Sequence, residues 1–171
     1  YVKTLQKIIL KKPKYLDLHL RMHPSQERQG VKIKEYLKKI GNFIFDDERD
    51  LINSIQNSNL VIITQNSTTL LQSLSMNVPT VCYWNTKINP LRQLAENDFR
   101  RLEGVNIFFR DIDELTSFVD KKSKEINEWW DSKDVQNERI QFCKKYASKS
   151  LSSSDKMKIK YDLKYEKNSP C

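Results

Sequence analysis

Short apolar segments alternate with longer amphipathic segments along most of the chain, and this alternation limits the folds open to it. The apolar segments are residues 15–22, 42–45, 59–64, 79–84 and 105–109. Between them lie stretches with helical spacing of apolar residues or with helix-start signals. Strands separated by helices are typical of a parallel sheet with right-handed crossovers. The sequence therefore predicts an α/β fold, a Rossmann-like parallel sheet with helices on both faces.

The stretches between the strands carry helix start and stop signals. Helices are expected in residues 31–40, 46–58, 69–76, 89–104, 111–130 and 134–149. Acidic residues open the second of these, which suits the positive end of a helix dipole. In the fourth, Pro90 lies early and Gly104 at the expected end, the positions that each residue favours.

The length of 171 residues suits one globular domain. The chain does not begin with Met, and its first segment reads as the middle of a helix, so we interpret it as a fragment. We predict a helix left from a preceding region (1–14), a Rossmann-like domain (15–148) and a basic, flexible tail (149–171). The three cysteines are far apart in the sequence, which favours buried or free thiols in a reducing compartment, the cytoplasm.

The net charge of +8 is concentrated at the C-terminal end. From Lys144 onward the chain has eight lysines against three acidic residues, and this surplus of five leaves +3 for residues 1–143. A basic tail with little apolar periodicity is typical of a solvated segment or of one that contacts an anionic membrane surface. We therefore expect no nucleic-acid partner, and peripheral contact with the inner face of a membrane stays open.

A cluster of polar residues, Asn66, Ser67, Thr68 and Thr69, joins the third strand to the next helix. In a parallel sheet, ligands gather at the carboxyl ends of the strands, where loops lead into helix N-termini. Unpaired backbone N–H groups and the positive end of the dipole favour an anion there, so the cluster predicts a phosphate site. The alternative is that Asn66 or Ser67 only caps the helix.

The first strand ends in a second polar group. Its leucines share one face, and the period of two places His19, Arg21 and His23 on the other. Arg21 and His23 lie nearest the carboxyl end, where Pro24 stops the strand. A guanidinium and an imidazole there could hold the phosphate of a nucleotide from the other side. His19 is interpreted as an ordinary surface residue.

Several of these motifs together resemble a known family. A strand ending in "HP", the segment "NSTTLLQSLSMNVPTVCYWN", a later "WW" and "VQNERIQFCKKYA" are similar to bacterial transferases of surface-carbohydrate biosynthesis. The wider group has the GT-B fold and includes capsule polysaccharide transferases, CDP-glycerol glycerophosphotransferases and polysialyltransferase-type enzymes. The resemblance covers residues 15–148 and implies the C-terminal, donor-binding half of a GT-B fold.

The resemblance also implies roles for particular residues. His23, Ser67 and Thr68 match positions that bind the phosphate of the donor nucleotide. Gln72 stands where the group commonly has Glu, a position that would accept hydrogen bonds from the ribose hydroxyls.

Phe45 and Asp46 end the second strand, where the base of the nucleotide could rest or where the chain simply leaves the strand. The general base is expected in the N-terminal half of the GT-B fold, so no catalytic residue is assigned here. Apart from Asp111 and Asp113 at the expected start of a helix, the sequence has no Asp-x-Asp pair, and it has no His/Cys cluster. We therefore expect no metal and no cofactor.

The sequence thus predicts the donor-nucleotide-binding half of a transferase. This enzyme would move a glycosyl or glycerophosphate-like group from a nucleotide-activated donor to a bacterial surface carbohydrate. Its expected partners are the nucleotide-sugar donor, the carbohydrate acceptor and the N-terminal domain of the same protein. The alternative is a non-catalytic Rossmann-like module whose basic tail docks on an anionic membrane or on nucleic acid.

Overall fold

The fold is described from a computed structural model that covers residues 2–22 and 33–147. The elements are α1 (Val2–Lys11), β1 (His19–Leu20), β2 (Ile44–Phe45), α3 (Leu51–Gln56), β3 (Val61–Ile63), α4 (Thr68–Ser75), β4 (Thr80–Tyr83), α5 (Gln93–Gly104), β5 (Phe108–Phe109), α6 (Ile112–Lys122), the 3-10 helix η1 (Ser123–Glu125), α7 (Ile126–Trp130) and α8 (Lys133–Tyr146). Residues 33–38 are also helical.

The described strands pair in parallel and form two sheets. β1 and β2 make a two-stranded sheet in which Leu20 pairs with Phe45. β4 is the central strand of a three-stranded sheet, where Cys82 pairs with Ile63 of β3 on one side and with Phe108 of β5 on the other. The predicted α/β class is confirmed, but the described strands lie in two sheets where the sequence predicted one.

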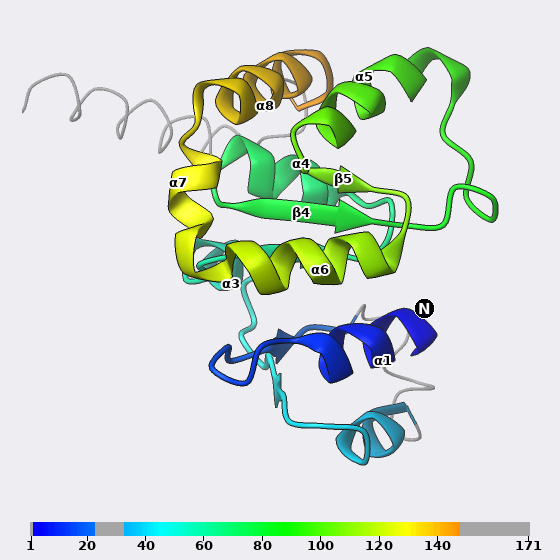
Figure 1. Cartoon of the computed structure of the whole chain (residues 1–171), viewed down its shortest axis with the longest axis vertical. Coiled ribbons are helices and arrows are strands. Elements are labelled where there is room, and N and C mark those ends of the chain that lie inside the picture. The colour runs from blue at the N-terminus through cyan, green and yellow to red at the C-terminus, as the bar shows by residue number, and fades with distance from the viewer. Residues whose placement is uncertain (1, 23–32, 148–171) are drawn as a thin grey trace, which may run out of the picture.

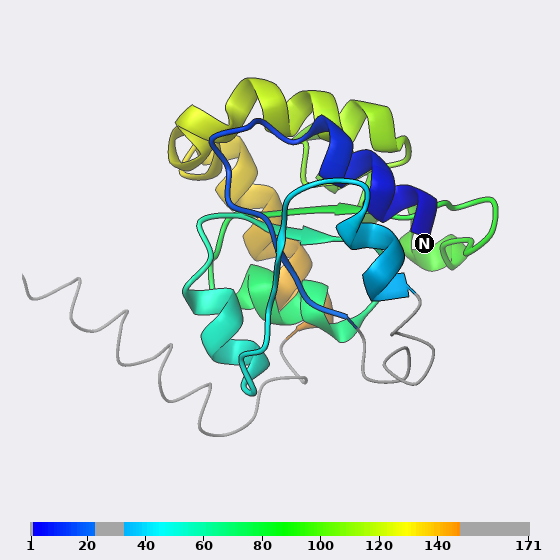
Figure 2. The same cartoon turned by 90° about the horizontal axis from the view of Figure 1, so that it is seen from below.

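Helices cover both faces of the three-stranded sheet. α1 and α6 lie on one side of β4, whereas α4, α5 and α8 lie on the other (Figures 1 and 2). Val81 enters a hydrophobic cluster with Ile8 of α1 and Leu115 of α6. Its neighbour Cys82 enters a second cluster with Leu74 of α4. The alternation of side chains along β4 therefore builds one core on each face of the sheet.

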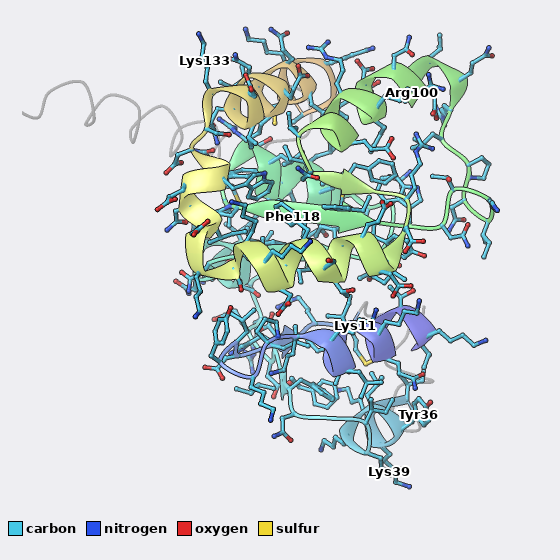
Figure 3. The ribbon with its side chains drawn as sticks, in the orientation of Figure 1. Lys11, Tyr36, Lys39, Arg100, Phe118 and Lys133 are labelled. Carbon is cyan, nitrogen blue, oxygen red and sulfur yellow. The ribbon has the colours of Figure 1, made fainter. Side chains whose placement is uncertain are left out.

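Ion pairs as well as apolar contacts fix α1 on α6. Lys7 Nζ and Lys11 Nζ donate to the two carboxylate oxygens of Asp113, at 2.8 and 2.7 Å. Figure 3 shows Lys11 between the two helices. Hydrogen bonds from Lys11 and Lys7 lower the pKa of Asp113 to about 2. The first helix is thus joined to the larger sheet through α6.

The C-terminal end of α4 is held by residues of the last two helices. The Trp130 indole donates to the backbone oxygen and to Oδ1 of Asn77, at 3.1 Å each. Arg139 Nη1 donates to the backbone oxygen of Leu74 at 2.8 Å. Asn77 has φ of 56°, in the left-handed region that commonly ends a helix. α7 and α8 therefore close the end of α4 that is remote from its N-terminal hydroxyls.

Several predicted elements are shorter in the structure. The first strand pairs only at His19–Leu20, although Leu20 and Met22 are buried as expected. The helix predicted over 89–104 begins at Gln93, so Pro90 lies in the loop before it. The predicted division of the chain at residues 14 and 148 stays a prediction.

The helix predicted over 111–130 is interrupted at residues 123–125. The segment 120–125 has no apolar side chain that a continuous helix could bury. The hydroxyl of Ser123 also forms a hydrogen bond with that of Tyr15, at 2.6 Å. The loss of an apolar stripe explains why α6 ends at Lys122.

Two features bear on the predicted class of protein. Cys82 and Cys143 are free thiols, as the spacing of the cysteines indicated. Across the described ranges, no helix is long and apolar enough to cross a membrane.

Asn77 generates a prediction about stability. In Asn77→Ala the left-handed backbone should cost about 1 kcal/mol of the free energy of unfolding, because Ala tolerates this region poorly. Trp130 keeps the backbone oxygen of residue 77 as acceptor. Asn77→Gly should stay within about 0.5 kcal/mol of wild type, since Gly adopts positive φ freely. Urea unfolding checks both variants, and equal losses would show that the backbone conformation is not the cause.

Candidate functional site

The polar cluster of residues 66–69 lies where β3 leads into α4. β3 ends at Ile63 and α4 begins at Thr68, so the cluster covers the last loop residues and the first turn of the helix. Asn66 and Thr68 are exposed, and Ser67 and Thr69 are half-buried. The predicted position of this cluster at the carboxyl end of a parallel strand is therefore confirmed.

The cluster does not act as a side-chain cap. Ser67 is the N-cap residue, with φ of −146° and ψ of 162°, but its hydroxyl forms no capping hydrogen bond with the described residues. Asp50 and Asp111, by contrast, cap α3 and α6 by accepting from Ile52 N at 2.8 Å and from Asp113 N at 2.6 Å. For Ser67, the capping alternative is wrong in this structure.

The polar groups at the start of α4 are consequently available. Within residues 2–22 and 33–147, the side chains of Asn66, Ser67, Thr68 and Thr69 make no hydrogen bond. The first N–H groups of any helix also lack partners within the helix, and its N-terminal end carries partial positive charge. This arrangement can bind an anion through backbone and hydroxyl donors together.

Two buried side-chain polar atoms, one just after β4 and one on α4, have no hydrogen-bond partner among the described residues. Trp84 directly follows β4, is 2% exposed and packs against Phe99 and Phe108. Its indole N–H has no acceptor, and Oε1 of Gln72 on α4 has no donor, among the described residues. A buried polar atom without a partner costs free energy, which makes both side chains candidates for contact with a ligand.

The sequence analysis did not identify Trp84 as a candidate site residue, because Trp84 is only the last residue of an apolar segment there. The available signal was the position of a tryptophan at the carboxyl end of a buried strand. Gln72 was predicted to contact the ribose, and that role stays a prediction.

A second group surrounds a cavity of about 320 Å³ at the carboxyl ends of β1 and β2. The cavity is lined by Leu20, Arg21, Met22, Lys34, Phe45, Asp46, Asp47, Glu48 and Arg49. It brings together Arg21, Phe45 and Asp46, three of the residues that the sequence analysis singled out.

Arg21 is anchored to the segment that follows β2. Its Nη1 donates to Asp46 Oδ2 at 3.1 Å and to the backbone oxygen of Glu48 at 2.6 Å. Its Nη2 lies 3.4 Å from the backbone oxygen of Arg49. Most of the N–H groups of Arg21 therefore donate to residues 46–49 and hold that segment in place. The sequence did not indicate this structural role.

Asp46 is the acceptor around which this segment folds. Its side chain is 11% exposed and accepts from Arg21, from the hydroxyl of Ser54 and from Glu48 N, the last at 3.0 Å. Burial raises the pKa of Asp46, but the hydrogen bonds from Ser54, Glu48 and Arg21 outweigh it and lower the pKa below 3.8. Asp46 is thus held as a carboxylate.

Phe45 presents its ring to two lysines. Lys34 Nζ lies 4.9 Å and Lys38 Nζ 5.7 Å from the ring centroid, both within the range of a cation–π contact. The sequence analysis named Phe45 but missed both lysines, since their approach depends on how residues 33–38 pack against β2. Of these two lysines, Lys34 also lines the cavity.

The two groups belong to different sheets. The described residues form no hydrogen bond or ion pair between residues 66–69 and the cavity at β1 and β2. His23 lies outside the described residues, so its predicted phosphate contact stays a prediction. In the described ranges, no group of three or more His, Cys, Asp or Glu side chains could hold a metal ion.

The fold and these groups define an α/β protein with parallel strands and polar clusters at the strand ends. A family model supplies the assignment: residues 9–160 match the model described as LIC12162 family transferase. The match spans most of the 171 residues, so the chain belongs to this transferase family. No curated protein and no solved structure matches the chain.

The Asp46 network yields a prediction about stability and pH. Asp46→Asn should lower the free energy of unfolding by about 1.5 to 3 kcal/mol at neutral pH, because hydrogen bonds to a charged group are lost. Since the folded pKa is lowered, this stabilisation is present above the unfolded value of 3.8 and disappears as pH falls through the folded value.

Urea unfolding from neutral pH to below pH 4 checks the effect of Asp46→Asn. Asp47→Asn is a matched control, since Asp47 is exposed and makes no side-chain hydrogen bond with the described residues. Equal stability of the two variants at neutral pH would contradict a structural role for the Asp46 carboxylate.

Proposed function

We propose that this chain is the donor-nucleotide-binding half of a GT-B-like transferase. It would move a glycosyl or glycerophosphate-like group from a nucleotide-activated donor to a bacterial surface carbohydrate. Membership of a transferase family supports the reaction class. The resemblance of the "NSTTLLQSLSMNVPTVCYWN" segment to surface-carbohydrate transferases supports the finer assignment.

One observation carries the proposal: the N-terminus of α4 leaves its polar side chains unused. Ser67 occupies a capping position without capping, and its three polar neighbours have no partner among the described residues. A helix start normally satisfies some of its N–H groups with such side chains. Here both the hydroxyls and the backbone donors remain for an anion, and the diphosphate of a nucleotide donor fits that chemistry.

The mechanism follows from where negative charge develops. Cleavage of the donor leaves charge on the departing phosphate, and fixed donors aimed at that phosphate lower the barrier. In this proposal Ser67 and Thr68, the first N–H groups of α4 and the His23 imidazole contact the phosphates. The general base that deprotonates the acceptor belongs to the N-terminal half of the enzyme.

The remaining residues would bind the nucleoside. Gln72 lies one turn into α4, and its unpartnered Oε1 could accept from a ribose hydroxyl. Phe45 offers a ring beside Lys34 and Lys38, and the base would rest against this ring. Arg21 and Asp46 would chiefly hold the wall of this cavity in place, and the remaining N–H groups of Arg21 would be left for a phosphate.

The proposal also fixes the setting of the reaction. Nucleotide-activated donors are cytoplasmic metabolites, so we place the protein in the cytoplasm, with its acceptor at the inner face of the membrane. The non-catalytic alternative assigned binding to the basic tail, whose residues 149–171 lie outside the described ranges. Membership of a transferase family favours the enzyme.

Substitution at the start of α4 tests the proposal. Ser67→Ala combined with Thr68→Ala should weaken nucleotide binding about a hundredfold or more, at about 1.5 to 3 kcal/mol for each lost charge-assisted hydrogen bond. Stability should change by less than about 0.5 kcal/mol, since neither hydroxyl is bonded to a described residue. A thermal-shift screen with CMP, CDP, UDP and GDP selects the ligand, and calorimetry then measures the affinity.

Ser117→Ala is the matched control for this experiment. Ser117 is an exposed hydroxyl on α6 without a hydrogen bond to the described residues. Its removal should leave nucleotide affinity unchanged. If the Ser67→Ala, Thr68→Ala variant bound nucleotide with wild-type affinity and kept its stability, the cluster would not bind the phosphate.

A second prediction concerns metal dependence. The phosphate donors named above are hydroxyls, backbone N–H groups and an imidazole, which need no bridging cation. Nucleotide affinity measured by calorimetry in EDTA should therefore stay within a few-fold of that in magnesium. A much larger loss in EDTA would show that a carboxylate such as Asp47 holds a metal in the complex.

A further inference from the structure

The loop between β4 and α5 exposes aliphatic side chains. Ile88 is 74% exposed and Leu94, at the start of α5, is 91% exposed. The loop projects past the carboxyl end of β4 in both views (Figures 1 and 2). Single exposed aliphatic residues are common in proteins, but one in a short projecting loop and a second in the first turn of the following helix call for a partner.

The same loop carries two unpaired cations. Lys87 and Arg92 are exposed and form no ion pair with the described residues. The acidic side chains of α5 already form ion pairs elsewhere. Glu96 and Glu103 pair with Arg110, at 2.7 and 3.1 Å, and Asp98 pairs with Lys145 at 2.6 Å. The projecting loop therefore presents aliphatic groups and positive charge without compensating negative charge.

We propose that residues 85–94 form a contact site for an anionic lipid surface. Ile88 and Leu94 enter the boundary between headgroups and acyl chains, and Lys87 and Arg92 pair with lipid phosphates. Aliphatic side chains flanked by cations are the chemistry that binds at such an interface. A protein partner fits less well, because the cores of protein interfaces are enriched in aromatic residues and residues 85–94 contain none.

This contact site is distinct from the basic tail and from the proposed donor site. It uses none of the tail residues after Lys144 and none of residues 66–72. Binding to lipid can therefore fail while nucleotide binding succeeds, and the reverse is equally open to measurement.

Cosedimentation of the full chain with vesicles tests the proposal. The wild type should bind vesicles of equal parts phosphatidylglycerol and phosphatidylcholine more tightly than vesicles of phosphatidylcholine alone. Ile88→Ser with Leu94→Ser should weaken binding to the anionic vesicles by about tenfold or more, since two aliphatic groups no longer leave water. Lys87→Gln with Arg92→Gln should weaken it by about fivefold for each cation.

Matched variants separate this loop from the rest of the surface. Leu10→Ser removes an aliphatic side chain that is 60% exposed on α1, and it should leave vesicle binding unchanged. Lys39→Gln with Lys133→Gln removes the same charge from exposed positions elsewhere, labelled in Figure 3, and should weaken binding less than the loop variant. The basic tail is identical in all variants, so its contribution cancels.

Three outcomes would overturn the proposal. The wild type could fail to distinguish anionic from neutral vesicles, or the Ile88/Leu94 variant could bind them as wild type does. In the third outcome, these two variants alter concentration-dependent self-association in gel filtration but not vesicle binding, which would make the loop a protein interface. Urea unfolding verifies that each variant is folded, as expected for side chains with this exposure.

Discussion

Burial of β4 on both faces is the constraint on which the rest of the structure depends. Val81 and Cys82 are each 0% exposed, yet they face opposite hydrophobic clusters. A strand buried in this way needs a helical layer on each side and a paired strand at each edge, which α4, α6, β3 and β5 supply. Because β3 is in register with β4, the start of α4 is placed at the same edge as Trp84.

The sequence predicted those features that apolar patterning records directly. Continuous apolar runs indicated buried strands, and the alternation over residues 15–22 correctly separated buried Leu20 and Met22 from exposed His19. Patterning reports burial, and burial decides which segments become strands or helices. The position of residues 66–69 followed for the same reason, since a strand and a helix on either side fix the joint between them.

Other features depend on partners that are distant in sequence. Arg21 and Asp46 are 25 positions apart, and only the pairing of β1 with β2 brings them together. Residue type left Ser67 open to either capping or phosphate binding, whereas in the folded loop its hydroxyl makes no hydrogen bond with the described residues. The approach of Lys34 and Lys38 to Phe45 and the unpartnered indole of Trp84 likewise arise from tertiary packing. No local pattern contains that information.

The anchoring of α4 by Asn77 and Leu74 has a mechanical consequence. The eight-residue helix α4 is about 12 Å long. Hydrogen bonds from Trp130 and Arg139 hold its C-terminal end. A displacement of α7 or α8 would have to break or stretch these hydrogen bonds or move the C-terminal end of α4 with it. The last two helices therefore help to fix the position of the helix that carries the hydroxyl cluster at its other end.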